Sequence, residues 1–210
     1  EEMWAVRLDG SGNGDDAAYD LVLDDVDHVV VTGRTAVNGW AADYLTVKYS
    51  PSGAELWAVS HGGSGQGVDI AYAVALDSHG YFRVAGSRYD SVNTDFGVVA
   101  YDSEGLEIWA NGAERVEGLE DRFGSGESDS GARAMAMDAE GNTYVAGRAY
   151  NGSNYDFVTR KFGIDGSLLW SAVYNGTGNR DDDPYALALD SNGNVIVTGG
   201  SFSSVTATDF

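Results

Sequence analysis

The chain has 210 residues, with 33 acidic and 12 basic side chains, a formal net charge of −21 and no cysteine. A surface this acidic repels phosphate backbones and anionic lipid, which argues against binding to nucleic acids and membrane surfaces. No stretch approaches the ~20 apolar residues that membrane insertion needs. The lack of cysteine excludes disulfides, thiolate metal sites and a cysteine nucleophile.

A repeated unit runs along the chain, and a tryptophan marks each copy in the same register. The four copies begin at steps of 53, 52 and 61 residues, at Trp4, Trp57, Trp109 and Trp170. A fixed period of this size is typical of propellers, solenoids and arrays. Three further landmarks keep the register: a Leu-Asp or Met-Asp pair, a glycine (Gly33, Gly86, Gly147, Gly199) and an Asp-aromatic pair.

In chain order, the first segment (1–8) is predicted to be the last strand of a unit. The second unit shows the full pattern, with short apolar runs at 71–76, 81–85, 96–101 and 106–109. Such runs, bounded by Gly, Asp and Asn turns, are typical of antiparallel strands in a meander. Four strands in about 52 residues predict one blade of an all-β propeller, with strands a to d from the inside outwards. A parallel β-helix is the alternative, but its period would not contain four turns.

The third unit is longer because of its loop at 111–131, which is a candidate binding loop or a tolerated insertion. The last stretch, 186–210, is predicted to hold strands a and b and the start of strand c. We therefore expect a single β-propeller domain or propeller segment over residues 1–210, open at both ends. The first strand could close the ring, the chain could belong to a longer protein, or a neighbouring subunit could complete the ends by strand addition. A longer protein is favoured.

Two strings then resemble a known family. Residues 188–199 (ALDSNGNVIVTG) and 156–170 (DFVTRKFGIDGSLLW) look like the SBBP repeat, a bacterial β-propeller repeat. The resemblance covers almost the whole chain in four copies. It implies a secreted or cell-surface prokaryotic protein in which the repeats act as scaffolds or binding modules, and it implies no catalytic residue.

Loops from d to a and from b to c are predicted to lie on one acidic face. Calcium prefers six to eight oxygen ligands on flexible loops, so six aspartates are candidate ligands: Asp15, Asp16, Asp69, Asp181, Asp182 and Asp183. One aspartate at the start of each c strand is interpreted instead as a turn cap; these are Asp43, Asp95, Asp156 and Asp209.

Aromatic residues differ between the b-to-c loops. Trp40, Tyr89 and Tyr150, with Asn154 beside them, are the candidate ligand-binding residues, because aromatic planes and amides suit sugar rings. The alternative is that Trp40 and Tyr155 pack on the blade edge. The in-register tryptophans are interpreted as blade packing.

The function expected from these observations is a non-catalytic scaffold or adhesion module of an extracellular prokaryotic surface or filament protein, with calcium in its acidic loops. Its expected partners are other subunits, and cell-surface glycans under the alternative of a glycan-binding propeller. A secreted hydrolase or lyase using the acidic face is the second alternative. The three histidines recur at no matching positions, so no catalytic residue is predicted.

Overall fold

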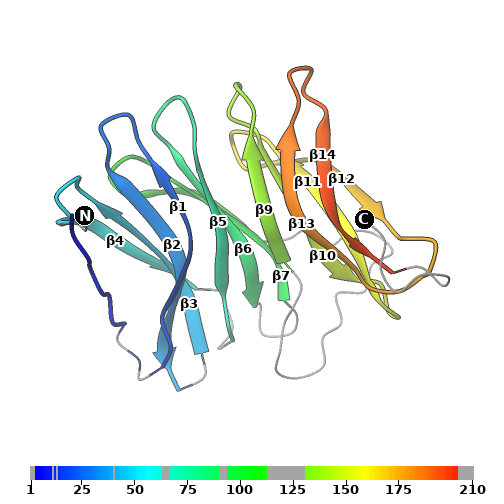
Figure 1. Ribbon diagram of the computed structural model, residues 1–210, viewed down its shortest axis with the longest axis horizontal. Coiled ribbons are helices and arrows are strands. Elements are labelled where there is room, and N and C mark those ends of the chain that lie inside the picture. Colours follow the sequence, from blue (N-terminus) through cyan, green and yellow to red (C-terminus); the bar gives the residue numbers. More distant parts are fainter. Residues whose placement is uncertain are drawn as a thin grey trace.

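The computed structural model describes residues 3–10, 12, 14–39, 41–62, 67–89, 94–112 and 131–202. These residues form fourteen β-strands, and no helix occurs among them. The strands make antiparallel sheets that stand side by side in chain order (Figure 1). In the described part of the chain, no helix is long and apolar enough to cross a membrane.

Three sheets have four strands each, ordered as in the sequence, and a fourth has two. Sheet 1 contains β1 (Ala17–Leu23), β2 (Val29–Asn38), β3 (Ala41–Tyr49) and β4 (Glu55–His61). Sheet 2 contains β5 (Ile70–Leu76), β6 (Phe82–Tyr89), β7 (Thr94–Tyr101) and β8 (Glu107–Gly112). Sheet 3 contains β9 (Gly131–Met137), β10 (Thr143–Tyr150), β11 (Tyr155–Phe162) and β12 (Leu168–Tyr174). Sheet 4 contains β13 (Asp182–Leu189) and β14 (Val195–Ser201).

The predicted all-β meander of four-stranded units is confirmed. The strands of each sheet are called a to d in chain order. Two details of the prediction were wrong: residues 3–10 form no regular strand, and the second strand of sheet 2, predicted over 81–85, continues through Gly86 to Tyr89. Sheet 1 and sheet 4 lie at opposite ends of the row (Figure 1), so the described sheets do not form a closed ring.

A glycine in strand b lets strand a approach closely. In all four sheets the pairing of a and b is irregular next to this residue. A Cβ on Gly33, Gly86 or Gly147 would lie 1.9 Å from a carbonyl oxygen of strand a. A side chain there would push the two strands apart, which is why a glycine recurs inside the strand and does not end it.

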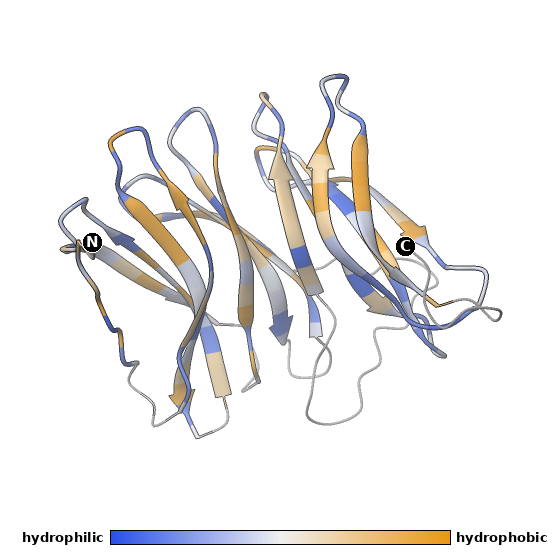
Figure 2. Cartoon of the chain, viewed as in Figure 1, coloured by the Kyte–Doolittle hydropathy of each residue, from blue (hydrophilic) through white to orange (hydrophobic). Residues whose placement is uncertain are grey.

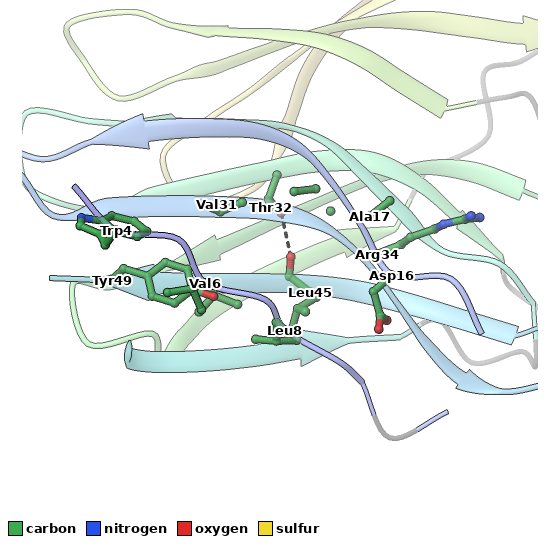
Figure 3. A pocket seen from close by; sticks show the side chains of 13 residues that line it. Trp4, Val6, Leu8, Asp16, Ala17, Val31, Thr32, Arg34, Leu45 and Tyr49 are labelled. Atoms are coloured by element: carbon green, nitrogen blue, oxygen red, sulfur yellow. Dashed lines mark hydrogen bonds between the residues drawn. The ribbon is translucent and has the colours of Figure 1, made fainter. Parts of the chain in front are cut away.

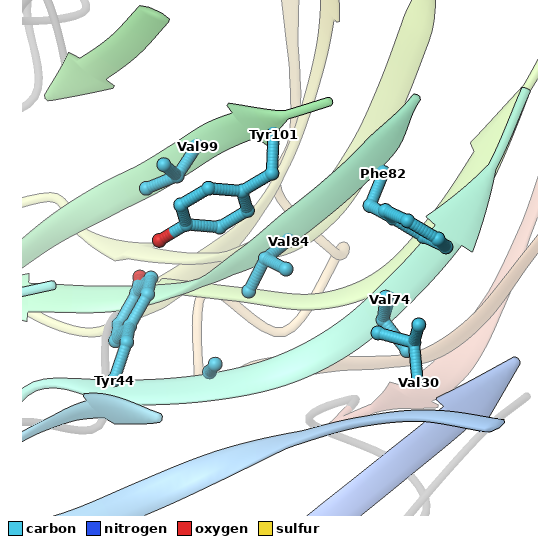
Figure 4. Packing of buried hydrophobic residues seen from close by; sticks show 8 residues of the cluster. Val30, Tyr44, Val74, Phe82, Val84, Val99 and Tyr101 are labelled. Atoms are coloured by element: carbon cyan, nitrogen blue, oxygen red, sulfur yellow. The ribbon is translucent and has the colours of Figure 1, made fainter. Parts of the chain in front are cut away.

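The core lies between neighbouring sheets. Strand β5 packs against β1 and β2, β9 against β5 and β6, and β13 against β9 and β10. Between sheets 1 and 2, Val30 and Tyr44 meet Val74, Phe82 and other residues of sheet 2 (Figure 4). A second cluster fills the boundary of sheets 2 and 3. Each fully buried aliphatic or aromatic side chain contributes roughly 1.5–3 kcal/mol to folding, so these boundaries hold the row together.

A tryptophan latch joins residues 3–10 to sheet 1, strand d of sheet 1 to sheet 2, and strand d of sheet 2 to sheet 3. The indole Nε1–H groups of Trp4, Trp57 and Trp109 donate to the carbonyl oxygens of Pro51, Ser103 and Ile164, at 3.0, 3.0 and 2.8 Å. These carbonyls lie in the c-to-d turn of the following sheet. The glycine that ends each turn has a positive φ of +80° to +84°, and a Cβ on it would lie 2.7 or 2.8 Å from the indole ring; these glycines are Gly53, Gly105 and Gly166. The turn thus leaves room for the ring.

A cation lies beside the turn aspartate of each four-stranded sheet. The ammonium groups of Lys48 and Lys161, both in strand c, lie 3.1 and 3.3 Å from carboxylate oxygens of Asp24 and Asp138. Sheet 2 has an alanine at the corresponding position of strand c. There the cation is Arg83 of strand b, directly opposite that alanine in the register, and it lies 3.7 Å from Asp77.

Candidate functional site

The two ends of the strands differ in their connections. The a-to-b and c-to-d turns lie at one end, called the turn end, and the b-to-c and d-to-a connections lie at the other, called the loop end (Figure 1). Each a-to-b turn is capped by an aspartate whose Oδ1 accepts backbone amides, as Asp77 does from His79 and Tyr81 at 2.8 and 3.0 Å. All candidate calcium ligands lie at the loop end.

Asp16, Asp69 and Asp182 occupy the same position before or at the start of strand a. Asp16 accepts the amides of Gly10 and Ala36, both at 2.9 Å, and these hydrogen bonds lower its pKa. Asp69 accepts the amide of Tyr89. These carboxylates therefore tie the incoming loop and the end of strand b to strand a, which is a folding role that the sequence pattern left unassigned.

Asp182 forms only half of this arrangement. Its Oδ2 accepts the amide of Gly176 at 2.7 Å, while its buried Oδ1 has no hydrogen-bond partner among the described residues. In sheets 1 and 2 the matching oxygen accepts the amide three residues after the strand-b glycine. The corresponding amide here belongs to Phe202, and β14 ends one residue earlier, at Ser201. The unpartnered Oδ1 of Asp182 is therefore placed to accept the backbone amide of the residue that follows β14.

The neighbours of Asp182 have different partners. Asp181 accepts the amide of Tyr155 at 3.0 Å, and Asp183 forms an ion pair with Arg148. Asp15 is exposed. The sequence argument held that turn capping needs one aspartate and not three, but here each of the three consecutive carboxylates has its own protein partner.

Asp156 is the most buried of the described aspartates that begin a strand c. It is 3% exposed, and the side-chain amide of Asn151 donates to both of its oxygens at 3.0 Å. Burial, and to a smaller degree the charge of Asp182, raises the pKa of Asp156 against these hydrogen bonds. Burial likewise raises the pKa of Asp43, which His61 opposes. Asp209 lies outside the described residues.

Within the described ranges, no group of three or more His, Asp or Glu side chains is arranged to hold a metal ion. Calcium at Asp15, Asp16, Asp69 and Asp181–Asp183 stays a prediction. Such a site would combine carboxylate oxygens that already accept hydrogen bonds with others, such as Asp182 Oδ1, that have no partner among the described residues, together with backbone carbonyls and amide oxygens.

The described candidate ligand-binding residues lie in two sheets: Tyr89 in sheet 2, and Tyr150 and Asn154 in one hairpin of sheet 3. Trp40 is outside the described residues. Tyr89 ends strand b of sheet 2 and lies over Gly67, where a Cβ would be 2.1 Å from its ring. Tyr150 pairs with Tyr155 across the hairpin of sheet 3, with ring centroids 5.4 Å apart. Asn154 is 5% exposed and donates to the Arg180 carbonyl at 2.6 Å, so its amide holds two loops together.

Two apolar grooves lie elsewhere. Groove 1, of about 300 Å³, runs between residues 3–8 and sheet 1, with Trp4, Val6 and Leu8 facing Leu45 and Tyr49 (Figure 3). Groove 2, of about 400 Å³, lies between β11–β12 and β14. Sequence reasoning missed both grooves and the cations. The signal for the cations was present, because Lys48 and Lys161 each precede a repeat tryptophan by nine residues.

The chain matches no protein-family model and no curated protein. The likeness of its strings to the SBBP repeat therefore stays a resemblance.

Proposed function

We propose that the chain is a non-catalytic scaffold: a segment of a β-propeller whose sheets stack through identical contacts and whose open ends assemble with other subunits. The observation that carries this proposal is the tryptophan latch. One Trp, one carbonyl and one positive-φ glycine recur where residues 3–10 meet sheet 1, where sheet 1 meets sheet 2 and where sheet 2 meets sheet 3. A scaffold depends on the features that its units have in common, and the recurring residues here are ones that pack neighbouring sheets together.

The same proposal includes the setting of the protein. The acidic, lysine-poor composition and the SBBP-like strings favour a secreted or cell-surface prokaryotic protein, in which the propeller segment serves adhesion or spacing. Loop-end carboxylates make calcium the candidate ion of this setting.

Light scattering on the full chain tests the scaffold. We expect a concentration-dependent mass that rises in multiples of 22.2 kDa, because unpaired edges template strand addition. Repeating the measurement with calcium and then with chelator asks whether calcium supports the assembly. A monomer at all concentrations, combined with saturable binding of a small ligand, would contradict the scaffold proposal.

A glycan-binding role is the second candidate, and one arrangement at the loop end favours it. Arg148 stacks over Tyr155 at 4.3 Å, and Tyr155 in turn packs against Tyr150. A pair of half-exposed tyrosines is suited to stacking against a sugar ring. Binding to a panel of immobilised glycans, followed by the Tyr150→Ala variant, tests it; equal binding by both proteins would remove this site.

A further inference from the structure

One residue of every strand a is left out of the pairing with strand b, and these residues recur in register. Next to the strand-b glycine, the register of each pair skips one residue of strand a, which forms a β-bulge. The skipped residue lies five positions before the aspartate that caps the a-to-b turn. The inner row is defined here as these four residues: Tyr19, Tyr72, Arg133 and Tyr185. A bulge changes the direction of the side chain that it carries, and bulges are common next to active sites.

The members of the inner row contact one another across the sheet boundaries. Strands β1, β5, β9 and β13 lie side by side, each packed against the next (Figure 2). The ring centroids of Tyr19 and Tyr72 are 5.3 Å apart, and Cζ of Arg133 lies over the Tyr72 ring, 5.3 Å from its centroid. These three side chains therefore form a continuous line across three sheets, and Tyr185 occupies the same position in the fourth.

The inner row does not belong to the core clusters between the sheets. Tyr19 and Tyr185, at its two ends, are 45% and 69% exposed, whereas Tyr72 and Arg133 are partly buried. An alanine lies next to each member in the chain, so the larger side chains extend beyond their neighbours in strand a. The strand-b glycine already permits the bulge, so the fold does not require an aromatic side chain at this position. An exposed line of tyrosines indicates a binding surface.

The direction of the inner row narrows the class of ligand. The row runs across the strands, whereas a peptide that adds to a sheet edge runs along a single strand. Such a peptide would therefore meet only one member of the row. A ligand that meets several members is recognised by ring contacts and by hydrogen bonds to the phenol and guanidinium groups. Strand a also has one edge that pairs with no other strand among the described residues, and this edge supplies further backbone donors and acceptors.

We propose that the inner row binds an uncharged polysaccharide chain that lies across the four a strands. Tyr19 and Tyr185 supply exposed ring faces for the apolar faces of sugar rings, and Tyr72 and Arg133 supply hydrogen-bonding groups between them. Tyrosine gives a large, rigid contact area at a low cost in side-chain entropy. The net charge of −21 disfavours an acidic chain, and the positive charge of Arg133 in the middle of the row disfavours a cationic one. This inference rests on the glycan-binding candidate of the proposed function and places the sugar on the inner row instead of at Tyr150.

Neutral disaccharides and hexasaccharides are the probes, drawn from glucans, xylans, mannans and galactans and titrated against the full chain by calorimetry. We expect a hexasaccharide to bind more tightly than its disaccharide, because only a longer chain contacts several members of the row. Tyr19→Ala and Tyr185→Ala should each weaken hexasaccharide binding at least about tenfold. Both side chains are exposed, so both variants are expected to fold. Tyr81→Ala is the matched control, because Tyr81 is 38% exposed but lies at the turn end; its affinity is expected to be unchanged.

Several results would overturn the inner row as the sugar site. These are no binding of any neutral hexasaccharide, or binding by Tyr19→Ala and Tyr185→Ala as tight as that of the unaltered chain. Binding confined to a uronic acid hexasaccharide or to polylysine would also overturn it, because charge would then govern recognition. Loss of binding in Tyr150→Ala alone would place the sugar at the loop end and leave the glycan-binding candidate standing. Light scattering measures assembly without sugar, so the scaffold proposal is tested separately from all of these results.

Discussion

The turn end and the loop end use aspartate in the same way but surround it differently. At the turn end, the aspartate of each a-to-b turn caps that turn and, in sheets 1 to 3, also lies beside a cation. At the loop end, the recurring aspartate ties a loop to strand b, but its neighbours change from one sheet to the next. Asp183 pairs with Arg148, whereas Asp156 is held by asparagines.

This difference separates architecture from specificity. The turn end carries the latch, the turn caps and the buried cations, so substitutions there should cost folding free energy. The loop end tolerates variation because its connections are longer and the sheets share only the aspartate before strand a. Loops on a rigid scaffold are also where binding residues concentrate. The predictions below test this contrast, beginning with the largest expected effect.

Trp57→Ala and Trp170→Ala compare a latched tryptophan with an open one. Trp57 packs against the first core cluster and donates to Ser103, so its loss should cost about 3–5 kcal/mol of unfolding free energy. Trp170→Ala should cost less than about 1 kcal/mol, because the ring is 37% exposed and its indole N–H has no acceptor in the part of the chain that the structure describes. Urea denaturation measures both. Equal losses would show that the latch adds nothing beyond packing within the sheet.

The next prediction compares a buried cation on strand b, as in sheet 2, with one on strand c, as in sheet 1. Arg83 and the Asp77 side chain are both about 1% exposed, so Arg83→Val leaves a buried carboxylate without its cation and should cost about 3 kcal/mol. The double variant Arg83→Val, Ala100→Lys recreates the Val30 and Lys48 pair of sheet 1 in the same register. We expect it to regain most of the loss. A double variant as unstable as the single one would mean that a cation on strand c of sheet 2 cannot replace the one on strand b.

Substitutions at two turn glycines distinguish the cost of backbone strain from the cost of crowding against the indole ring. Gly80 and Gly105 have φ of +83° and +80°, but a Cβ on Gly80 meets no atom within 4 Å, whereas one on Gly105 meets Trp57 at 2.8 Å. Gly80→Ala should therefore cost about 1 kcal/mol and Gly105→Ala about 2–3 kcal/mol. The difference, read from denaturant midpoints, is the contribution of the latch contact. A zero difference would show that the indole shifts without penalty.

The fold was largely predictable from the sequence, and the site was not. Turn residues at fixed intervals and short apolar runs predict the four-stranded units, because local chemistry decides where strands start and stop. The grooves depend on which sheet lies next to which, and no local pattern carries that information. Asp181–Asp183 looked like surplus carboxylates, because Tyr155 and Arg148, the partners of Asp181 and Asp183, lie on other strands, and Gly176, the partner of Asp182, lies earlier in the same loop.

Acid should weaken the turn end through the protonation of Asp24. Burial opposes the ionisation of Asp24, but hydrogen bonds from His28 and Lys48 hold its pKa down to about 2. A lowered pKa stabilises the fold above the unfolded value near 4, and this contribution disappears as the pH falls towards 2. Asp24→Asn should remove about 1–2 kcal/mol at neutral pH and flatten the stability profile between pH 4 and 2. Asp156, whose pKa is raised, should give the opposite slope above pH 4, where ionisation favours the unfolded chain.

Calcium is expected to give the smallest effect, and it acts at the loop end. If Asp181–Asp183 bind calcium in addition to their protein partners, calcium at about ten times the dissociation constant adds roughly 1.4 kcal/mol, or about 3–5 °C in melting temperature. Asp183→Asn should abolish the increase, whereas Asp165→Asn, at the turn end, should leave it intact. A melting temperature that is the same in calcium and in chelator would mean that the loop-end carboxylates only form hydrogen bonds and ion pairs within the protein. The acidic face would then owe its charge to folding and solubility, and the variable aromatic loops would be the remaining place for a ligand on that face.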